Sequence, residues 1–432
     1  MSERAIQSQR LRREIGTFGA VMMGLGAMIG TGVFVSIGLG AGIAGPAVIL
    51  ALLLAAGIAL CNGLSSAQLA AAHPVSGGTY EYGYIYVSPW AGFTAGWVFL
   101  VAKSASAATA ALGFSGYLLH AFGYGSRYLV PTALSTLAVL TVVVLTGIRR
   151  SNTANVMIVS VTLLSLSFFV IAGIPLMDSR NLVPFFAGEP DRGSVTALLE
   201  ATALMFVAYT GYARIATLGE EVREPRRTIP KAIVASAAVV MLLYGAVALV
   251  GVGVAGSDGL LAATETQTAP LAVVAERFSV PMSSYVLVIG ALTAMLGVLL
   301  NLILGLSRVV LAMARRGDVP GVLGRLNASG TTPYWAVLAV AVIIAALITI
   351  GEVRTTWSFS AFAVLIYYSL TNLAAWRMAP SERLYPRWIA GLGLVACLGL
   401  AFWVERRVWL AGLGSILIGL VWHAIARRRS IV

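Results

Sequence analysis

Lys103 is a charged residue in a long apolar stretch of the chain. It stands roughly 20 Å along a helix that begins where the stretch begins, and a cation at the centre of a bilayer costs about 2.5 to 3.5 kcal/mol. Because a lysine removed from water can release its proton, Lys103 is a candidate for proton exchange or for pairing with a carboxylate. A structural contact with backbone carbonyl groups is the alternative. Arg214 lies in another apolar stretch, but a guanidinium stays charged, so we expect a structural or gating role for it.

Two apolar stretches are interrupted by glycine. The first contains Gly24, Gly26, Gly30 and Gly32, and the second, residues 206–212, reads Phe-Val-Ala-Tyr-Thr-Gly-Tyr. Glycine allows a helix to open and a ligand to approach the main chain, and the free N–H groups of a half-helix can bind a carboxylate. Close helix packing through Gly26 and Gly30 is the alternative for the first stretch. Paired interruptions of this kind are typical of a transporter binding site.

No other set of residues indicates a metal site or a catalytic centre. The cysteines and histidines are far apart in the sequence: Cys61, Cys397, His73, His120 and His423. They lack metal-ligand spacing. Glu200, at the start of an apolar stretch, is the most deeply placed acid, and no nucleophile–base pair is visible. The sequence therefore predicts neither an enzyme nor a bound metal or cofactor.

The composition is that of a membrane protein. The chain has 432 residues, of which 59% are hydrophobic and 11% charged, and its mean hydropathy is +0.90. Soluble domains carry about 25% charged residues. These values exclude a soluble enzyme, a nucleic-acid binder and a secreted disulfide scaffold, and they predict an all-α integral membrane protein surrounded by a lipid bilayer.

Apolar windows separated by turn signals predict twelve transmembrane helices. Their ranges are 16–40, 46–72, 87–118, 128–147, 153–176, 196–218, 231–256, 282–312, 333–350, 355–377, 388–404 and 407–426. Lys103 belongs to the third span, and the glycine-containing stretches belong to the first and the sixth. Spans one to five and six to ten are therefore expected to form two inverted units, with spans eleven and twelve appended.

The distribution of cations predicts the orientation. With the N-terminus inside, 20 of the 29 Lys and Arg residues lie in cytoplasmic segments and 7 in outer loops. Cytoplasmic loops are enriched in Lys and Arg, so we expect both termini in the cytoplasm of a cell with a prokaryotic-type plasma (inner) membrane. The net charge of +12 is then explained by topology, not by a nucleic-acid partner. Nothing in the sequence defines an oligomeric state.

Four stretches resemble the amino acid–polyamine–organocation (APC) superfamily, and most closely its bacterial amino acid permeases. They are Gly26-Ala-Met-Ile-Gly-Thr-Gly-Val-Phe34, Pro74-Val-Ser-Gly-Gly-Thr-Tyr80, residues 219–230, and residues 307–317 with Thr332-Pro333. The resemblance covers spans one to ten. It implies the 5+5 inverted-repeat fold of the bacterial leucine transporter, with broken helices 1 and 6 and alternating access. The expected division is a cytoplasmic tail at 1–14, a first repeat at 15–195, a second at 196–377, and spans eleven and twelve with a tail at 378–432.

The resemblance also implies the substrate site. The residues expected at the substrate carboxylate are Ile29, Gly30, Thr31 and Gly32. Those expected at the ammonium group and the side chain are Phe206, Val207, Ala208, Tyr209, Thr210 and Gly211. Aligning span three by its Gly-Tyr-Leu end places Lys103 at a substrate-lining position, and Ala107 shares its helix face. The chain departs from the family at Gln68, where many members have Glu, and in its fifth span, which lacks the lysine of several proton-coupled members.

The same comparison suggests the coupling ion. Sodium-coupled relatives use hydroxyl groups on span eight, whereas residues 294–306 contain no Ser or Thr, and hard cations need oxygen ligands. We therefore expect a proton, carried by Lys103, and not sodium. A positive pocket without an acid repels cationic side chains, so the predicted function is proton-coupled symport of small neutral amino acids. The alternatives are an obligate exchanger, in which Lys103 is a fixed charge, a transporter of an anionic amino acid, and a non-transporting amino acid sensor.

Overall fold

The computed structural model describes residues 15–73, 77–146, 152–186, 193–216, 222–327 and 332–429. The predicted cytoplasmic tail at 1–14 lies outside these ranges. Within them the chain is helical, with one isolated bridge between Ile15 and Val222. The α-helices are α2 Thr17–Met28, α3 Ile37–Ala44, α4 Val48–Ala72, α5 Thr79–Tyr86, α6 Pro89–Ala121, α7 Leu129–Leu145, α8 Asn152–Gly173, α9 Ser194–Tyr209, α10 Ala213–Ala216, α11 Pro225–Gln267, α12 Pro270–Ala275, α13 Ser283–Arg316, α14 Tyr334–Ile348, α15 Val353–Arg377, α16 Arg387–Ala401 and α17 Arg406–Arg429. Short 3-10 turns are Gly45–Ala47, Ser126–Tyr128, Ile174–Leu176, Ser179–Leu182, Thr210–Tyr212 and Gly321–Gly324.

Among the described residues, nine helical segments are long and apolar enough to cross a membrane. They are Gly32–Ala72, Pro89–Ala121, Ser126–Leu145, Thr153–Leu176, Ser194–Ala216, Pro225–Gln267, Ser283–Arg316, Val353–Arg377 and Arg406–Ala426. Three shorter apolar helices are Thr17–Met28, Tyr334–Ile348 and Arg387–Ala401. The helical, membrane-spanning architecture predicted from composition is therefore present.

The outer surface of the bundle is apolar. Leu164 on α8, Leu242 on α11 and Ile418 on α17 are 71%, 70% and 65% exposed. Large apolar side chains exposed on several helices are unfavourable in water but match the hydrocarbon of a bilayer. The chain is thus apolar on both its lipid-facing and its buried sides, which explains its composition.

Helix α6 is deeply buried and packs against α13 and α15. Its buried face is rich in small residues, such as Ala105, Ala108 and Ala111, which are fully buried. Small residues let helix backbones approach closely in a membrane protein. This packing holds the middle of α6, including Lys103, inside the bundle.

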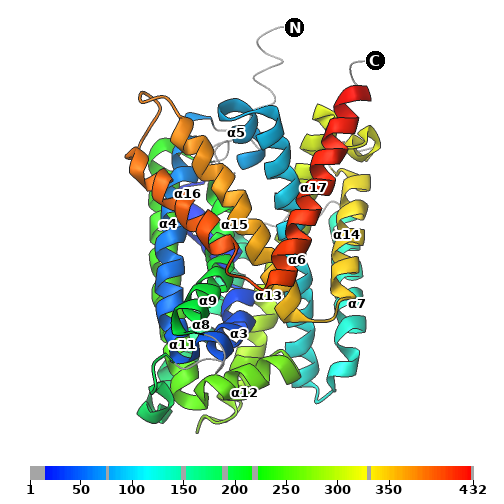
Figure 1. The fold of residues 1–432 in the computed structure, drawn as a ribbon. Helices are drawn as coiled ribbons and strands as arrows, with labels where there is room; N and C mark the ends of the chain where they lie inside the picture. The colour runs from blue at the N-terminus through cyan, green and yellow to red at the C-terminus, as the bar shows by residue number, and fades with distance from the viewer. Residues whose placement is uncertain are drawn as a thin grey trace.

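The two ends of the bundle carry different elements. Helix α5 and the carboxyl end of α17 lie at one end, and α12 lies at the other (Figure 1). At the α5 end, Asp318 follows α13 and accepts hydrogen bonds from the hydroxyl groups of Tyr80, at 2.6 Å, and Tyr84, at 2.7 Å. Burial and the hydrogen bond to Asp318 raise the pKa of Tyr80, so its hydroxyl stays a donor. This contact, which the sequence did not indicate, ties α5 to the end of α13.

The backbone of α11 turns at Gly256, where φ is 74° and ψ is 164°. Such a conformation is strained for residues with a side chain and accessible to glycine. The seventh span was predicted to end at this residue. The chain continues beyond it as a helical segment to Gln267 and then forms α12, neither of which was predicted.

Candidate functional site

The first apolar segment is interrupted close to Gly30. Helix α2 ends at Met28, and Ile29 has an extended conformation, with φ −78° and ψ 112°. A π-helical turn, Gly32–Ser36 (η1), follows and leads into α3. The carbonyl oxygen of Gly30 accepts hydrogen bonds from both Val33 and Phe34 at 3.2 Å. Since a helix start leaves N–H groups without intrahelical partners, the interruption presents donors inside the bundle.

The second interruption follows α9. The chain tightens into a 3-10 turn, Thr210–Tyr212 (η6), and resumes as α10. Thr210 Oγ1 donates to the carbonyl oxygen of Val207 at 2.8 Å, and the hydroxyl of Tyr368 on α15 donates to the carbonyl oxygen of Thr210 at 3.1 Å. Both hydrogen bonds lie where the winding changes, and the one from Tyr368 ties this turn to α15.

The two interruptions pack against each other. A Cβ atom on Gly32 would overlap the Cβ of Ala208 and lie 2.8 Å from its Cα. A Cβ atom on Gly211 would overlap the carbonyl group of Ala27 and lie 2.5 Å from the backbone nitrogen of Met28. Because Cβ atoms do not approach backbone atoms this closely, glycine is required at both crossing points.

Lys103 is directed toward the second interruption. Its side chain is 8% exposed, and its Nζ atom donates to Thr210 Oγ1 at 2.8 Å. Since Thr210 Oγ1 in turn donates to the Val207 carbonyl, the ammonium group is linked through one hydroxyl to the backbone of the interrupted helix. Ala107, one turn further along α6, is fully buried.

Helix α6 is also fixed to α15 on this level, and α15 in turn is fixed to α9. Ser106 and Ser360 share a hydrogen bond of 2.7 Å, and Ser360 donates to the Ala102 carbonyl at 3.0 Å. Trp357 Nε1 donates to the carbonyl of Leu204 in α9 at 3.0 Å. These polar contacts keep the turn of α6 that carries Lys103 in a fixed position against the interrupted helix.

Four buried hydroxyl groups around the interruptions have no hydrogen-bond partner within the described part of the chain. They belong to Thr31, Ser104, Tyr209 and Tyr212. Thr31 is part of the first interruption, Ser104 follows Lys103, and Tyr209 ends α9. The ring of Tyr209 lies 5.4 Å from that of Tyr244, whose hydroxyl donates to the Met28 carbonyl at 2.8 Å. A buried hydroxyl without a partner is costly, so this region offers hydrogen-bonding capacity to a polar ligand.

The residues named from the sequence are distributed as follows. Ile29, Gly30, Thr31 and Gly32 are buried in the first interruption. Phe206, Val207, Ala208 and Tyr209 form the last turn of α9, and Thr210 and Gly211 begin the 3-10 turn. The change of winding in the sixth segment thus starts at Thr210, within the predicted stretch 206–212. In this conformation the carbonyl groups of Val207 and Thr210 accept hydrogen bonds from within the protein.

Two tyrosines outside the residues named from the sequence contact the interruptions. They are Tyr368 of α15 and Tyr244 of α11. Each donates to a carbonyl beside an interruption, at Thr210 and Met28 respectively. Aromatic residues in transmembrane helices are mostly packing residues, so only their position in the folded chain distinguishes these two.

Span eight contributes an apolar side chain to the first interruption. A Cβ atom on Gly30 would lie 2.8 Å from Cγ2 of Val298 on α13, so a methyl group of span eight faces Gly30. A hard cation bound beside Gly30 would instead require oxygen ligands from this span. Among the described residues, no group of three or more His, Cys, Asp and Glu side chains is placed to hold a metal ion. The polar groups identified above at the two interruptions are hydroxyls, backbone groups and the ammonium group of Lys103.

Comparison with known proteins finds amino acid permeases and other transporters that match nearly the whole chain. The family described as amino acid permease matches residues 19–430. An uncharacterized transporter of Mycobacterium tuberculosis is 37% identical over 422 residues, covering 96% of this chain and 92% of the relative. The branched-chain amino acid permease of Bacillus subtilis is 27% identical over 97% of this chain and 94% of its own length. The methylthioribose transporter of the same organism is 25% identical, covering 99% and 96%.

Proposed function

The chain belongs to the amino acid permease family, as its four sequence stretches indicated, and we propose that it is a secondary active transporter of small neutral amino acids coupled to protons. The observation that carries this proposal is the crossing of two interrupted helices beside a buried lysine. Lys103 Nζ lies 2.8 Å from Thr210 Oγ1 at this crossing. Interrupted membrane helices that meet inside a bundle are the usual way to expose backbone groups to a small zwitterion.

We further propose twelve spans in the 5+5 inverted arrangement, with repeats at 15–195 and 196–377 and cytoplasmic termini. Support comes from how the helices combine. The segment Gly32–Ala72 joins the second half of span one to span two. The three shorter apolar helices supply the first half of span one, span nine and span eleven. The orientation rests on the distribution of Lys and Arg.

The substrate class follows from charge. An ammonium group and unpartnered hydroxyls suit a carboxylate, whereas a cationic side chain would be repelled by Lys103. Small neutral amino acids fit this environment, and an anionic amino acid is the second candidate because Lys103 could pair with its extra carboxylate. The backbone N–H groups beyond Ile29 would hold the substrate carboxylate, and the turn from Phe206 to Gly211 would surround the ammonium and the side chain.

Proton coupling is proposed because Lys103 can exchange its proton when removed from water. Sodium is disfavoured since Val298, without an oxygen atom, faces Gly30. The rival within transport is an obligate exchanger in which Lys103 stays charged throughout the cycle. An amino acid sensor that keeps the fold but does not transport is the rival from another class.

Uptake into proteoliposomes separates these functions. With an inward proton gradient and no internal amino acid, we expect accumulation of a labelled small neutral amino acid that is independent of sodium. Uptake that requires internal amino acid would identify an exchanger. Binding in a thermal-shift assay without uptake under either condition would identify a sensor.

Thr210→Val is expected to lower substrate uptake by about 10-fold or more, because a hydrogen bond to a charged group contributes about 1.5 to 3 kcal/mol. The variant removes the hydroxyl group that accepts the hydrogen bond from the Lys103 ammonium group and preserves the approximate volume of the side chain. Initial uptake rates in proteoliposomes measure the effect. Thr210→Ser keeps the hydroxyl and should retain most of the activity; equal losses in both variants would contradict a role for the hydrogen bond.

A further inference from the structure

Helix α2, which leads into the first interruption, is narrow where it packs into the bundle. Gly24 and Gly26 are buried in the middle of this helix, and neither belongs to the substrate site proposed above. A Cβ atom on Gly24 would lie 2.8 Å from Oγ of Ser236 in α11. A Cβ atom on Gly26 would lie 2.6 Å from Oδ1 of Asn155 in α8. Each of these two glycines therefore makes room for a polar side chain of a neighbouring helix.

Both polar side chains reach the main chain of α2. Asn155 Nδ2 donates to the carbonyl oxygen of Met22 at 3.0 Å, and Ser236 Oγ donates to the carbonyl oxygen of Val21 at 3.3 Å. Both donors are buried, Asn155 at 6% exposure and Ser236 at 0%. Two helices that follow later in the chain thus bind α2 through its backbone, at two consecutive residues.

The two ends of α2 are held in the same manner. The backbone nitrogen of Arg223 donates to the carbonyl oxygen of Ile15, just before α2, at 2.9 Å. At the other end, the hydroxyl of Tyr244 in α11 donates to the carbonyl oxygen of Met28 at 2.8 Å. Apolar packing gives no hydrophobic driving force between helices inside a bilayer, whereas hydrogen bonds have a preferred length and direction. These bonds therefore determine how far α2 lies along its own axis.

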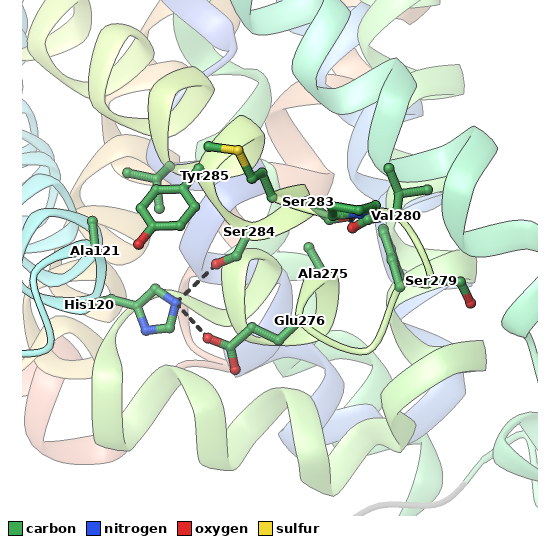
Figure 2. Close-up of a pocket in the computed structure, with 13 residues that line it drawn as sticks. His120, Ala121, Ala275, Glu276, Ser279, Val280, Ser283, Ser284 and Tyr285 are labelled. Carbon is green, nitrogen blue, oxygen red and sulfur yellow. Dashed lines mark hydrogen bonds and ion pairs between the residues drawn. The ribbon is translucent and has the colours of Figure 1, made fainter.

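The segment on the other side of the first interruption is held by a different helix. Tyr117 of α6 donates to the Phe34 carbonyl in the π-helical turn at 2.6 Å. The same end of α6 is anchored by His120, whose Nδ1 atom lies 2.7 Å from Gln267 Oε1. Its Nε2 atom lies 3.2 Å from Ser284 Oγ, beside a cavity of about 480 Å³ (Figure 2). The π-helical turn is thus positioned by α6, and α2 is positioned by α8 and α11.

The position of α2 affects the place where the two interruptions cross. The backbone of Ala27 and Met28, at the end of α2, is in close contact with Gly211 of the second interruption. Binding sites hold their groups to within about 0.5 Å of the productive geometry. Because Ile29 and Gly30 directly follow α2, even a small displacement of this helix along its axis would move their backbone groups relative to the second interruption.

We propose that Asn155 and Ser236 are positioning residues of the substrate site. They fix α2 along its axis, and α2 in turn places the backbone N–H groups that follow Ile29 against the second interruption. Both residues act through α2 and not by contact with the substrate. This positioning role rests on the proposed function, which assigns the substrate carboxylate to the first interruption.

Hydrogen–deuterium exchange of the purified full-length protein tests the hold on α2 without a transport assay. Asn155→Leu keeps the approximate size of the side chain but removes the donor. We expect protection of peptides covering residues 17–32 to fall about fivefold in this variant, as for the loss of one hydrogen bond, and peptides covering residues 353–377 to be unchanged. Ser236→Ala should cause a smaller loss in the same peptides, and it tests the role where Asn155→Leu does not fold.

Thr162→Val is a matched control in α8. Thr162 is buried, but its hydroxyl donates to the Ile158 carbonyl of its own helix at 2.8 Å, so this variant should exchange as the wild type does at residues 17–32. The positioning role is overturned if Asn155→Leu and Ser236→Ala leave residues 17–32 as protected as in the wild type. It is also overturned if both variants lose protection equally at residues 17–32 and 353–377, because that result would indicate general destabilisation.

Uptake of labelled L-alanine and L-serine into proteoliposomes gives the functional readout. Asn155→Leu is expected to raise KM about fivefold with little change in the maximal rate, because it displaces binding groups and removes none. An unchanged KM in a variant whose α2 has lost protection would also overturn the positioning role. Failure of the wild type to take up either amino acid would count against the proposed function, and the exchange measurement would still test the hold on α2.

Discussion

Lys103→Ala is expected to abolish accumulation of substrate driven by a proton gradient, reducing it to the level of liposomes without protein. Lys103 is buried beside the second interruption and donates to Thr210 at 2.8 Å. Alanine carries no group that can take up or release a proton, and it removes the ammonium group that donates to Thr210 Oγ1. Net uptake of labelled amino acid, measured at two external pH values, checks this expectation.

The chain offers a matched control, because Lys231 is its only other lysine and is exposed near the start of α11. Lys231→Ala should accumulate substrate as the wild type does. Lys103→Arg addresses the exchanger, since a guanidinium keeps its charge. Proton-driven accumulation should also be lost in Lys103→Arg, whereas a fixed-charge role would leave it active. Unchanged pH-dependent uptake in Lys103→Ala would remove the lysine from the mechanism.

Gly211→Ala is expected to separate the two interrupted helices and to eliminate uptake. The added Cβ atom would lie 2.5 Å from the Met28 nitrogen and overlap the Ala27 carbonyl. Because these are backbone atoms, they cannot move aside by a change of rotamer. Overpacking a close contact costs about 1 to 3 kcal/mol and occasionally more, and we expect the upper end of this range. The melting temperature and the initial uptake rate of the purified variant measure the effect.

Gly245→Ala is the matched control within a membrane-spanning helix. A Cβ atom at Gly245 of α11 meets no atom within 4 Å, and alanine is about 1 kcal/mol more favourable than glycine in a helix interior. This variant should be as stable as the wild type or slightly more stable. If Gly211→Ala behaved in the same way and transported at the wild-type rate, the close crossing of the two interruptions would not be needed for function.

The parts of the site that sequence reasoning reached are those marked by local composition. The glycines near Gly30 identified the place where α2 ends, and Gly211 identified the 3-10 turn Thr210–Tyr212. The short elements α5 and α12 were missed because eight or six residues give too little hydrophobic periodicity to detect. Asp318 was missed because its burial depends on Tyr80 and Tyr84, which lie far from it in the sequence.

The sequence by itself determined that this is a helical membrane protein of the amino acid permease family, with interruptions at two glycine-containing positions and a lysine deep in a span. These are properties of short stretches: hydropathy over a helix length, the conformational freedom of glycine and the order of motifs. Only the tertiary structure decided which groups meet. Lys103 and Thr210 are 107 residues apart and Tyr368 and Thr210 are 158 apart, and each pair depends on the rotation and crossing of helices packed by distant residues. That geometry is set by side-chain packing across the whole bundle, which no local stretch of sequence specifies.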